Sequence, residues 1–182
     1  PYLVLERLSD HRSMSVTHTR GALSKPVWHP DSSQLAFLYK HNQVCQIFIA
    51  AIDAIQNPSS WRPLTECNGS ASPKFQFAAD GRYLYFNDRQ SDIAGYQIFR
   101  VNLQTLAKDI INQPITNGRG NYDFDLSSDG SKLVLLNSEY DSKSRMYVLD
   151  IVHSKLTQTA RLPYLMRSVI WHHDNETLVH PS

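Results

Sequence analysis

The sequence predicts an all-β fold, a β-propeller of about four four-stranded blades, because one short pattern recurs along the chain. An aspartate preceded by an apolar residue at three positions and followed by a leucine at four positions occurs four times, at intervals of 49, 49 and 45 residues. Repeats of about 40 to 50 residues are typical of four-stranded propeller blades. The repeated residues are Trp28 and Asp31; Phe77, Asp80 and Gly81; Leu126, Asp129 and Gly130; and Trp171 and Asp174.

The composition of each repeat favours strands over helices. Tyr83 to Phe86 and Leu133 to Leu136 are short, crowded apolar runs, which are typical of strands buried on both faces. In order, the chain divides into a half repeat 1–21, complete repeats 22–69, 70–118 and 119–163, and a half repeat 164–182. In the first complete repeat we expect strands near 26–29, 34–40, 45–52 and 61–66.

The two half repeats have complementary contents, since the first supplies third and fourth strands and the last supplies first and second strands. If they joined in one blade, the chain would close as a four-bladed ring without a free edge. An open arc cut from a larger ring and a ring made by two chains are the alternatives, and the sequence does not choose among the three.

Two local segments complete the predicted architecture. Asp80-Gly81 and Asp129-Gly130 are typical of tight hairpin turns, in which glycine accepts a positive φ. The segment Leu103 to Ile111 has apolar spacing that a helical turn or two would tolerate. Because it falls where other repeats have the hairpin between the third and fourth strands, we interpret it as a lengthened loop in which a short helix could form.

The overall composition limits the classes of function. The chain has 182 residues and a formal net charge of +1, and no basic run supports nucleic-acid binding by this segment. No apolar run approaches the ~20 residues that span a bilayer. The sequence begins with Pro1 rather than methionine, so we expect a piece of a longer protein.

The two cysteines are predicted to form a disulfide within one blade. Cys45 opens the third strand of the first complete repeat and Cys67 closes the fourth. If the turn is centred at Asn57-Pro58-Ser59, antiparallel pairing places the cysteines opposite each other, at a separation that a disulfide can bridge. Such a bond implies an oxidising compartment. The alternative is a pair of buried free thiols.

The other side chains that could carry chemistry give weaker patterns. His172 and His173 are candidates for pH sensing, but we expect no metal site there, because adjacent strand residues point to opposite faces. Asp123, Asp125 and Asp129 depart from the EF-hand spacing and indicate polar alternation on an inner strand with a capped turn. Catalytic and phosphate-binding motifs are absent, so we predict no catalytic residues and no cofactor. The repeated aromatic residues are expected to form contacts between blades, with a ligand platform as the alternative.

At this point the repeats resemble those of a known family. The segment Trp28 to Phe37, WHPDSSQLAF, is similar to the Trp-Ser-Pro-Asp-Gly repeat of TolB-like propellers, and Phe77 to Gly81 and Leu126 to Gly130 are similar to it. The repeats differ from this pattern in two respects. Pro30 is the only proline at its position among the copies, and the last copy has no glycine. The sparse glycines and the small number of blades look most like the periplasmic sensor domains of ToxR- or CadC-like regulators, which carry a cytoplasmic winged helix and one membrane span.

The resemblance implies a binding protein rather than an enzyme. We expect the periplasmic sensing or interaction domain of a membrane-anchored transcriptional regulator, with a protein partner or small ligand on one propeller face and the capacity to form a homodimer. A TolB-like envelope scaffold and the non-catalytic propeller of a serine peptidase are the alternatives. This assignment is an analogy at the level of the fold, since one fold serves many functions.

Overall fold

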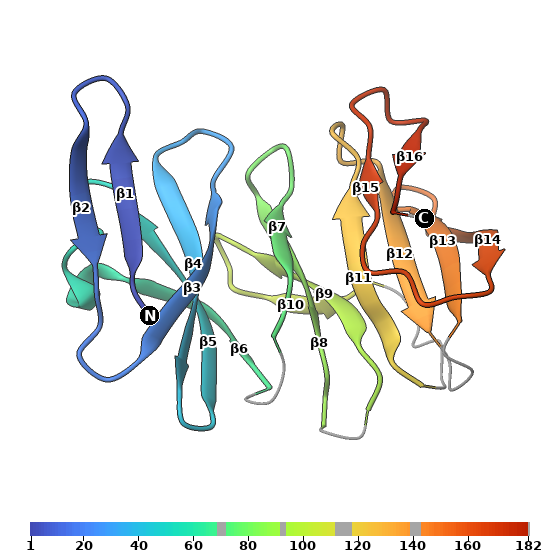
Figure 1. The fold of residues 1–182 in the computed structure, drawn as a ribbon, viewed down its shortest axis with the longest axis horizontal. Helices are drawn as coiled ribbons and strands as arrows, with labels where there is room; N and C mark the ends of the chain where they lie inside the picture. The colour runs from blue at the N-terminus through green and yellow to red at the C-terminus, as the bar shows by residue number, and fades with distance from the viewer. Residues whose placement is uncertain (69–71, 92–93, 112–117, 139–142, 182) are drawn as a thin grey trace.

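A computed structural model describes residues 1–68, 72–91, 94–111, 118–138 and 143–181, and it shows an all-β fold. The described residues form five antiparallel sheets, of which the first four follow one another along the longest axis of the molecule and the fifth overlaps the fourth in this view (Figure 1). Three of them have four strands each, and every sheet follows the order of the chain without crossovers. Successive four-stranded antiparallel sheets of this kind are the arrangement expected for the predicted β-propeller fold.

The sheets are numbered here as blades in chain order. The first half-blade contains β1 (Leu3–Arg7) and β2 (Arg12–Val16). Blade one contains β3 (Ala22–Trp28), β4 (Gln34–His41), β5 (Val44–Ala51) and β6 (Arg62–Cys67), with the short 3-10 helix η1 (Pro58–Ser60) before β6. Blade two contains β7 (Phe75–Phe77), β8 (Tyr83–Asp88), β9 (Gln97–Asn102) and β10 (Lys108–Ile110). Blade three contains β11 (Gly120–Leu126), β12 (Lys132–Ser138), β13 (Ser144–Asp150) and β14 (Lys155–Leu162). The last half-blade contains β15 (Ile170–Trp171) and β16 (Leu178–Val179).

The two half-blades lie on opposite sides of the molecule and form two separate two-stranded sheets (Figure 1). The structure is therefore an open row of blades, and β1–β2 and β15–β16 of one chain do not complete a single blade. Of the three arrangements that the sequence allows, closure of the single chain into a four-bladed ring is the one that the structure does not adopt.

The apolar core lies between neighbouring sheets, in one cluster at each junction of the row. Ala36 of blade one and Leu84 of blade two share such a cluster, and Tyr85 of blade two and Leu133 of blade three share the next. Because the middle strands contact a sheet on each side, their side chains are buried on both faces, which explains the continuous apolar runs in the sequence.

The segment Leu103 to Ile111 differs from its predicted form as a lengthened loop. The chain turns tightly after Asn102, whose side-chain oxygen accepts the backbone N–H groups of Gln104 and Thr105 at 2.9 and 3.0 Å. The fourth strand then begins at Lys108, which pairs with Val101. A helix does not form because the Asn102 side chain stabilises the turn and because Leu103 is buried in the core between blades one and two.

The aspartate of each repeat closes the turn between the first and second strands. Its Oδ1 atom accepts the backbone N–H group two residues later, at distances of 2.8 to 3.0 Å in all four copies. The residue after each aspartate has a positive φ, between 57° and 71°. These residues are Ser32, Gly81, Gly130 and Asn175. Glycine and asparagine adopt this conformation readily, and at Ser32 the bond from Ser33 to Asp31 holds the turn.

We expect these turns to make the protein sensitive to acid. Hydrogen bonds from neighbouring side chains and backbone N–H groups lower the pKa of Asp31 to about 2, and they lower the pKa of Asp80, Asp129 and Asp174 below its ordinary value. A carboxylate with a lowered pKa contributes stability above its unfolded pKa of about 4, and this stability is lost as the pH falls through the folded pKa. The free energy of unfolding in urea should therefore decrease between about pH 4 and 2.

The matched variant replaces the four turn aspartates with asparagine, whose side-chain oxygen still accepts the same hydrogen bonds. Its free energy of unfolding should change less steeply with pH over this range. Asp88 and Asp125, whose pKa is raised by burial, act in the opposite direction. They are present in both proteins, so the difference in slope isolates the turns. Equal slopes would contradict the assignment.

Candidate functional site

Polar side chains are buried mainly toward one edge of blades two and three. We call this edge, at which the second strand of a blade connects to the third, the loop edge; it lies opposite the edge with the aspartate turns (Figure 1). Apart from Ser127, which lies in a turn, the buried polar residues of the described chain are Asn87, Asp88, Gln97, Asn121, Asp123, Asn137, Ser138, Ser144 and Arg145. Because binding residues of many proteins sit on loops held by a rigid scaffold, this edge is the candidate site.

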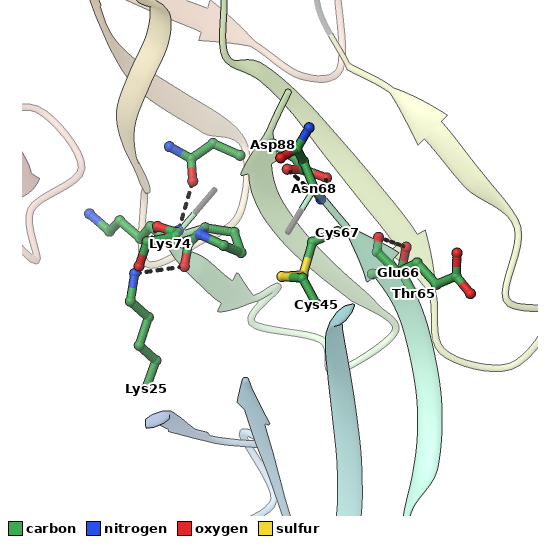
Figure 2. The surroundings of a disulfide bond; sticks show 11 residues. Lys25, Cys45, Thr65, Glu66, Cys67, Asn68, Lys74 and Asp88 are labelled. Atoms are coloured by element: carbon green, nitrogen blue, oxygen red, sulfur yellow. Dashed lines mark hydrogen bonds between the residues drawn. A yellow bond between two sulfur atoms is a disulfide. The ribbon is translucent and has the colours of Figure 1, made fainter. Parts of the chain in front are cut away.

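A disulfide reinforces the loop edge of blade one. Cys45 of β5 and Cys67 of β6 are direct partners in the sheet, with Cα atoms 5.0 Å apart, and their sulfur atoms are bonded (Figure 2). The next residue, Asn68, donates its backbone N–H to both carboxylate oxygens of Asp88 in blade two, at 3.2 and 3.1 Å. Burial raises the pKa of Asp88 above its ordinary value. The disulfide therefore fixes the strand end that contacts blade two.

Lys25 forms a second connection between blades one and two. Its ammonium donates to the backbone oxygens of Ser72 and Pro73, at 2.8 and 2.9 Å (Figure 2). The residue has a φ of 53° and lies in an irregularity of β3, between Ser24 and Val27. Burial, and then the charge of Lys40, lower the pKa of the Lys25 ammonium. The Lys25 ammonium thus donates hydrogen bonds to two backbone carbonyl oxygens that precede β7.

Asn87 joins blades two and three at the loop edge. Its side-chain oxygen accepts the backbone N–H of Lys74, and its side-chain nitrogen donates to the backbone oxygen of Tyr122, both at 2.7 Å. The ammonium of Lys74 lies 3.1 Å from one oxygen of Asp123, whose other oxygen accepts the backbone N–H of Val169 at 3.1 Å. This chain of contacts connects blade two to blade three and blade three to the segment that leads into the last half-blade.

The acids of β11 bind the next repeat. Asp125 accepts the backbone N–H of Trp171 at 2.8 Å, and burial raises the pKa of its carboxyl group. Asp129 closes its turn by accepting bonds from Ser127 and Ser131. In the structure, the acidic pattern at positions 123, 125 and 129 therefore combines contacts between blades with a capped turn.

A close backbone contact at the loop edge, which was not predicted from the sequence, joins blades two and three. Tyr96 and Gly120 form a parallel bridge between blades two and three, in which the N–H of Tyr96 donates to Arg119 and the N–H of Asn121 donates to Tyr96, both at 2.7 Å. Gly120 has a φ of +67°, and a Cβ atom placed on it would lie 2.5 Å from the oxygen of Tyr96. A glycine is therefore required at this position.

Three buried amide atoms at the loop edge have no hydrogen-bond partner within the described residues. They are the side-chain oxygens of Gln97 and Asn137 and the side-chain nitrogen of Asn121, although the Asn137 nitrogen donates to Asn121 at 3.0 Å. Buried polar atoms of this kind normally bind water or another polar group. These atoms lie inside the blades rather than on the surface, since Asn121 and Asn137 are fully buried.

The repeated apolar residues occupy two different environments. Phe77 and Leu126 are buried at the junctions between blades, and Trp171 is half-buried. Trp28 is 52% exposed, so the expectation that it packs between blades is wrong. The first half-blade consists only of β1 and β2, and Trp28 instead lines a cleft of about 800 Å³ beside β1, with Leu3, Leu5 and Leu35. We call this feature the β1 cleft.

The histidine pair lies in the last turn. The rings of His172 and His173 are 3.9 Å apart, so the premise that they point to opposite faces is wrong: both residues follow β15 and do not belong to the strand. The Nδ1 atom of His172 lies 3.1 Å from Asp174, and the equivalent His29 lies 2.7 Å from Asp31. The position of His172 is therefore that of a turn residue paired with the aspartate of its repeat.

The described residues contain no group of three histidine, cysteine, aspartate or glutamate side chains close enough to hold a metal ion. In the same part of the chain, no helix is long and apolar enough to cross a membrane. The polar contacts described above are hydrogen bonds and an ion pair that connect neighbouring blades.

Comparisons with known proteins identify the fold. No family model and no curated protein matches the sequence. The structure is similar to a prolyl endopeptidase (TM-score 0.71, 14% identity, 95% of this chain and 28% of that one). It is also similar to a chain of a nidogen/laminin complex (0.69, 14%, 99% and 63%) and to a putative TolB from Agrobacterium tumefaciens (0.64, 17%, 93% and 62%). The chain thus spans less than two thirds of each of these proteins, and the likeness concerns the propeller fold.

The disulfide should contribute substantially to stability. Because the bond links residues 22 positions apart, replacing both cysteines with alanine should lower the free energy of unfolding by ~2–4 kcal/mol. Denaturant unfolding with and without a reducing agent provides the measurement. The wild-type protein should lose stability on reduction and expose two titratable thiols. The stability of the double variant should be the same with and without the reducing agent. A wild-type protein with two free thiols before reduction would rule out the bond.

The contact at Gly120 should tolerate no side chain. Gly120→Ala should cost ~1–2 kcal/mol for the left-handed backbone and roughly 1–3 kcal/mol more for the clash with Tyr96. Gly130→Ala is the matched control, since its φ is +71° and an added Cβ atom would have no neighbour within 4 Å. Only the backbone cost should then appear in denaturant unfolding. Equal losses in the two variants would show that the contact between blades two and three does not restrict position 120.

Proposed function

We propose that the chain is a non-enzymatic sensing and interaction domain, in the periplasmic part of a membrane-anchored transcriptional regulator. The observation that carries this proposal is the loop edge, where buried amides and acids join the blades and a disulfide fixes the adjacent strand end. Such an edge is a rigid polar support on which connecting loops can recognise a partner. The acids that could serve in catalysis are engaged by backbone N–H groups of neighbouring blades.

The disulfide supports the proposed compartment. Disulfides persist in oxidising environments, which include the bacterial periplasm, and are rare in proteins of the cytosol. Cys45 is 2% exposed, and the sequence contains only these two cysteines, so the bond is placed for a structural role.

The geometry suggests how binding could be transmitted. Asp88 and Asn87 are adjacent on β8, and they face different neighbours: Asp88 accepts from Asn68, and Asn87 contacts Tyr122 of blade three. A ligand that competes for either set of hydrogen bonds would change how blade two sits between its neighbours. In a membrane-anchored regulator, such a change would alter the assembly state of the full-length protein.

Two other functions use the same fold. A TolB-like envelope scaffold would bind proteins without any link to DNA, and the propeller of a serine peptidase would control access to a catalytic domain. The structural likeness to a putative TolB and to a prolyl endopeptidase applies to both, so the distinction must come from the parent protein.

The proposal is tested by sequencing the gene that encodes this chain and by determining the membrane topology of the encoded protein. A winged helix followed by one apolar span of ~20 residues, encoded upstream, is the expected result. A signal peptide followed by further repeats would indicate the scaffold, and a downstream α/β-hydrolase domain would indicate the peptidase.

A second measurement addresses the compartment directly. In cells, Cys45 and Cys67 of the full-length protein should resist alkylation, and they should become reactive in a strain that lacks the periplasmic thiol oxidase. The variant with both cysteines replaced by alanine provides the background signal. Thiols that react fully in normal cells would contradict a periplasmic location.

A further inference from the structure

The first strands of successive blades begin next to one another at the loop edge. The strand β3 contacts β7, β11 contacts β15, and Gln76 of β7 bonds to Leu126 of β11. Basic residues stand at or beside each of these strand beginnings. We call them the basic rim, and they are Lys25, Lys40, Lys74, Arg119 and Arg167. Lys40 belongs to the end of β4 that pairs with the beginning of β3.

The rim residues are connected from one blade to the next. Lys25, Lys74 and Asp123 each stand three residues before the repeated apolar residue of their blade, so they occupy equivalent positions. Lys25 bonds to the two carbonyl groups just before Lys74 (Figure 2), and the Lys74 ammonium lies 3.1 Å from Asp123. Asp123 in turn accepts the N–H of Val169, two residues after Arg167. These contacts bring the strand beginnings together in one region of the loop edge.

Positive charge at the rim exceeds the negative charge of the acids beside it. Two acids of β11 lie against the rim, and both are engaged. Asp123 pairs with Lys74, and Asp125 accepts a backbone N–H of the last half-blade. Within the described chain, Lys25 donates to neutral carbonyl groups, and burial and then the charge of Lys40 lower its pKa. A carboxylate beside Lys25 would favour the charged form of its ammonium.

Lys25 is held at the rim by an unusual backbone conformation. Its φ of 53° lies in the left-handed region, which residues with long side chains rarely adopt. Pro26 follows directly, and the residue before a proline is normally extended. Strained conformations of this kind are found mainly at functional sites. An ammonium has three N–H donors, and the two carbonyl bonds leave one of them for a further acceptor.

Arg119 and Arg167 extend the rim into the solvent. Both residues are exposed, and a guanidinium group can bind a carboxylate through two parallel hydrogen bonds. Nucleic acid is a poorer match, because single strands are usually bound through bases that stack on exposed aromatic rings. No aromatic residue occurs in the strand beginnings, which are residues 20–25, 72–74, 118–121 and 167–169. The rim therefore suits carboxylates that a protein presents.

We propose that the basic rim binds an acidic segment of a partner protein, in which several aspartate or glutamate side chains lie close together. Arg119 and Arg167 bind carboxylates at the surface, and Lys25 donates its remaining N–H group to a further carboxylate. Such charge complementarity selects the partner and speeds its association. The inference names the kind of partner for the loop edge, so it rests on the proposed interaction function, but it does not depend on a membrane-anchored regulator.

Binding of an acidic peptide tests the rim, independently of the gene structure that tests the regulator. The probe is a fluorescein-labelled peptide of alternating glutamate and serine, and the measurement is its fluorescence anisotropy. The protein should bind this peptide, and added salt should weaken binding because it screens exposed charges. A peptide of alternating glutamine and serine is the control and should not bind. Failure of the acidic peptide to bind would overturn the inference, even if the gene encodes the proposed regulator.

A matched pair of double variants locates the site. Arg119→Gln with Arg167→Gln removes two exposed charges from the rim and should weaken binding of the acidic peptide roughly tenfold. Arg82→Gln with Lys155→Gln removes two exposed charges from the edge with the aspartate turns and should leave the affinity unchanged. The unfolding transition of each variant verifies that its fold is intact. Equal affinities of the two double variants would contradict binding at the rim.

Two further probes distinguish an acidic protein segment from other anions. They are a single-stranded oligonucleotide and vesicles that contain phosphatidylglycerol, compared with the peptide at the same salt concentration. The acidic peptide should bind more tightly than either of them. Tighter binding of the oligonucleotide or of the vesicles, lost in the rim double variant, would overturn the assignment of a protein partner.

Chemical coupling identifies the lysines that contact the peptide. A carbodiimide activates the carboxylates of the bound peptide, which then form amide bonds with neutral lysine amines. Because its lowered pKa leaves more of the neutral amine, Lys25 should be coupled most readily, followed by Lys40 and Lys74. Lys155 is the control, since it is exposed at the opposite edge. Digestion and mass spectrometry give the coupled positions, and coupling at Lys155 as strong as at the rim would overturn the inference.

Discussion

The aspartate turn sets the geometry on which the rest of this fold depends. In each repeat one carboxylate accepts the N–H group two residues later, which fixes the next backbone position at a positive φ and returns the chain as the second strand. Because this second strand is buried on both faces, a fixed turn also fixes which side chains meet the neighbouring blades. The first-to-second-strand hairpin is therefore the part of the repeat that the sequence preserves most strictly.

Neighbouring blades are held together by a combination of apolar clusters and directed polar contacts. Side chains of one blade bond to backbone groups of the next, as Asn87 does with Tyr122 and Asp125 with Trp171. Apolar contact alone is non-directional, whereas these bonds specify one relative position of two sheets. Asp125, whose carboxylate is of a type that could serve in catalysis, therefore has a structural role between blade three and the last half-blade.

The periodic features of the fold could be predicted from the sequence, and the contacts between repeats could not. The spacing of Asp31, Asp80 and Asp129 indicates the blades, and the pairing of Cys45 with Cys67 follows from hairpin geometry. The exposure of Trp28 depends on what stands before it, and the bridge between Tyr96 and Gly120 depends on how two blades approach each other. The sequence pattern within a single repeat does not predict the exposure of Trp28 or the bridge between Tyr96 and Gly120.

Each blade contacts only its neighbours in the row. The interactions that stabilise the blades are therefore distributed unevenly along the chain. Blade one carries the disulfide, whereas the last half-blade consists of two strands of two residues each. In such a linear array, stability is approximately a sum of terms for single units and for their interfaces, so opening can start at one end without melting the whole. Within the described row, the hairpin of β15 and β16 is thus the unit with the shortest strands, and its hydrogen bonds should open more readily than those of blade one.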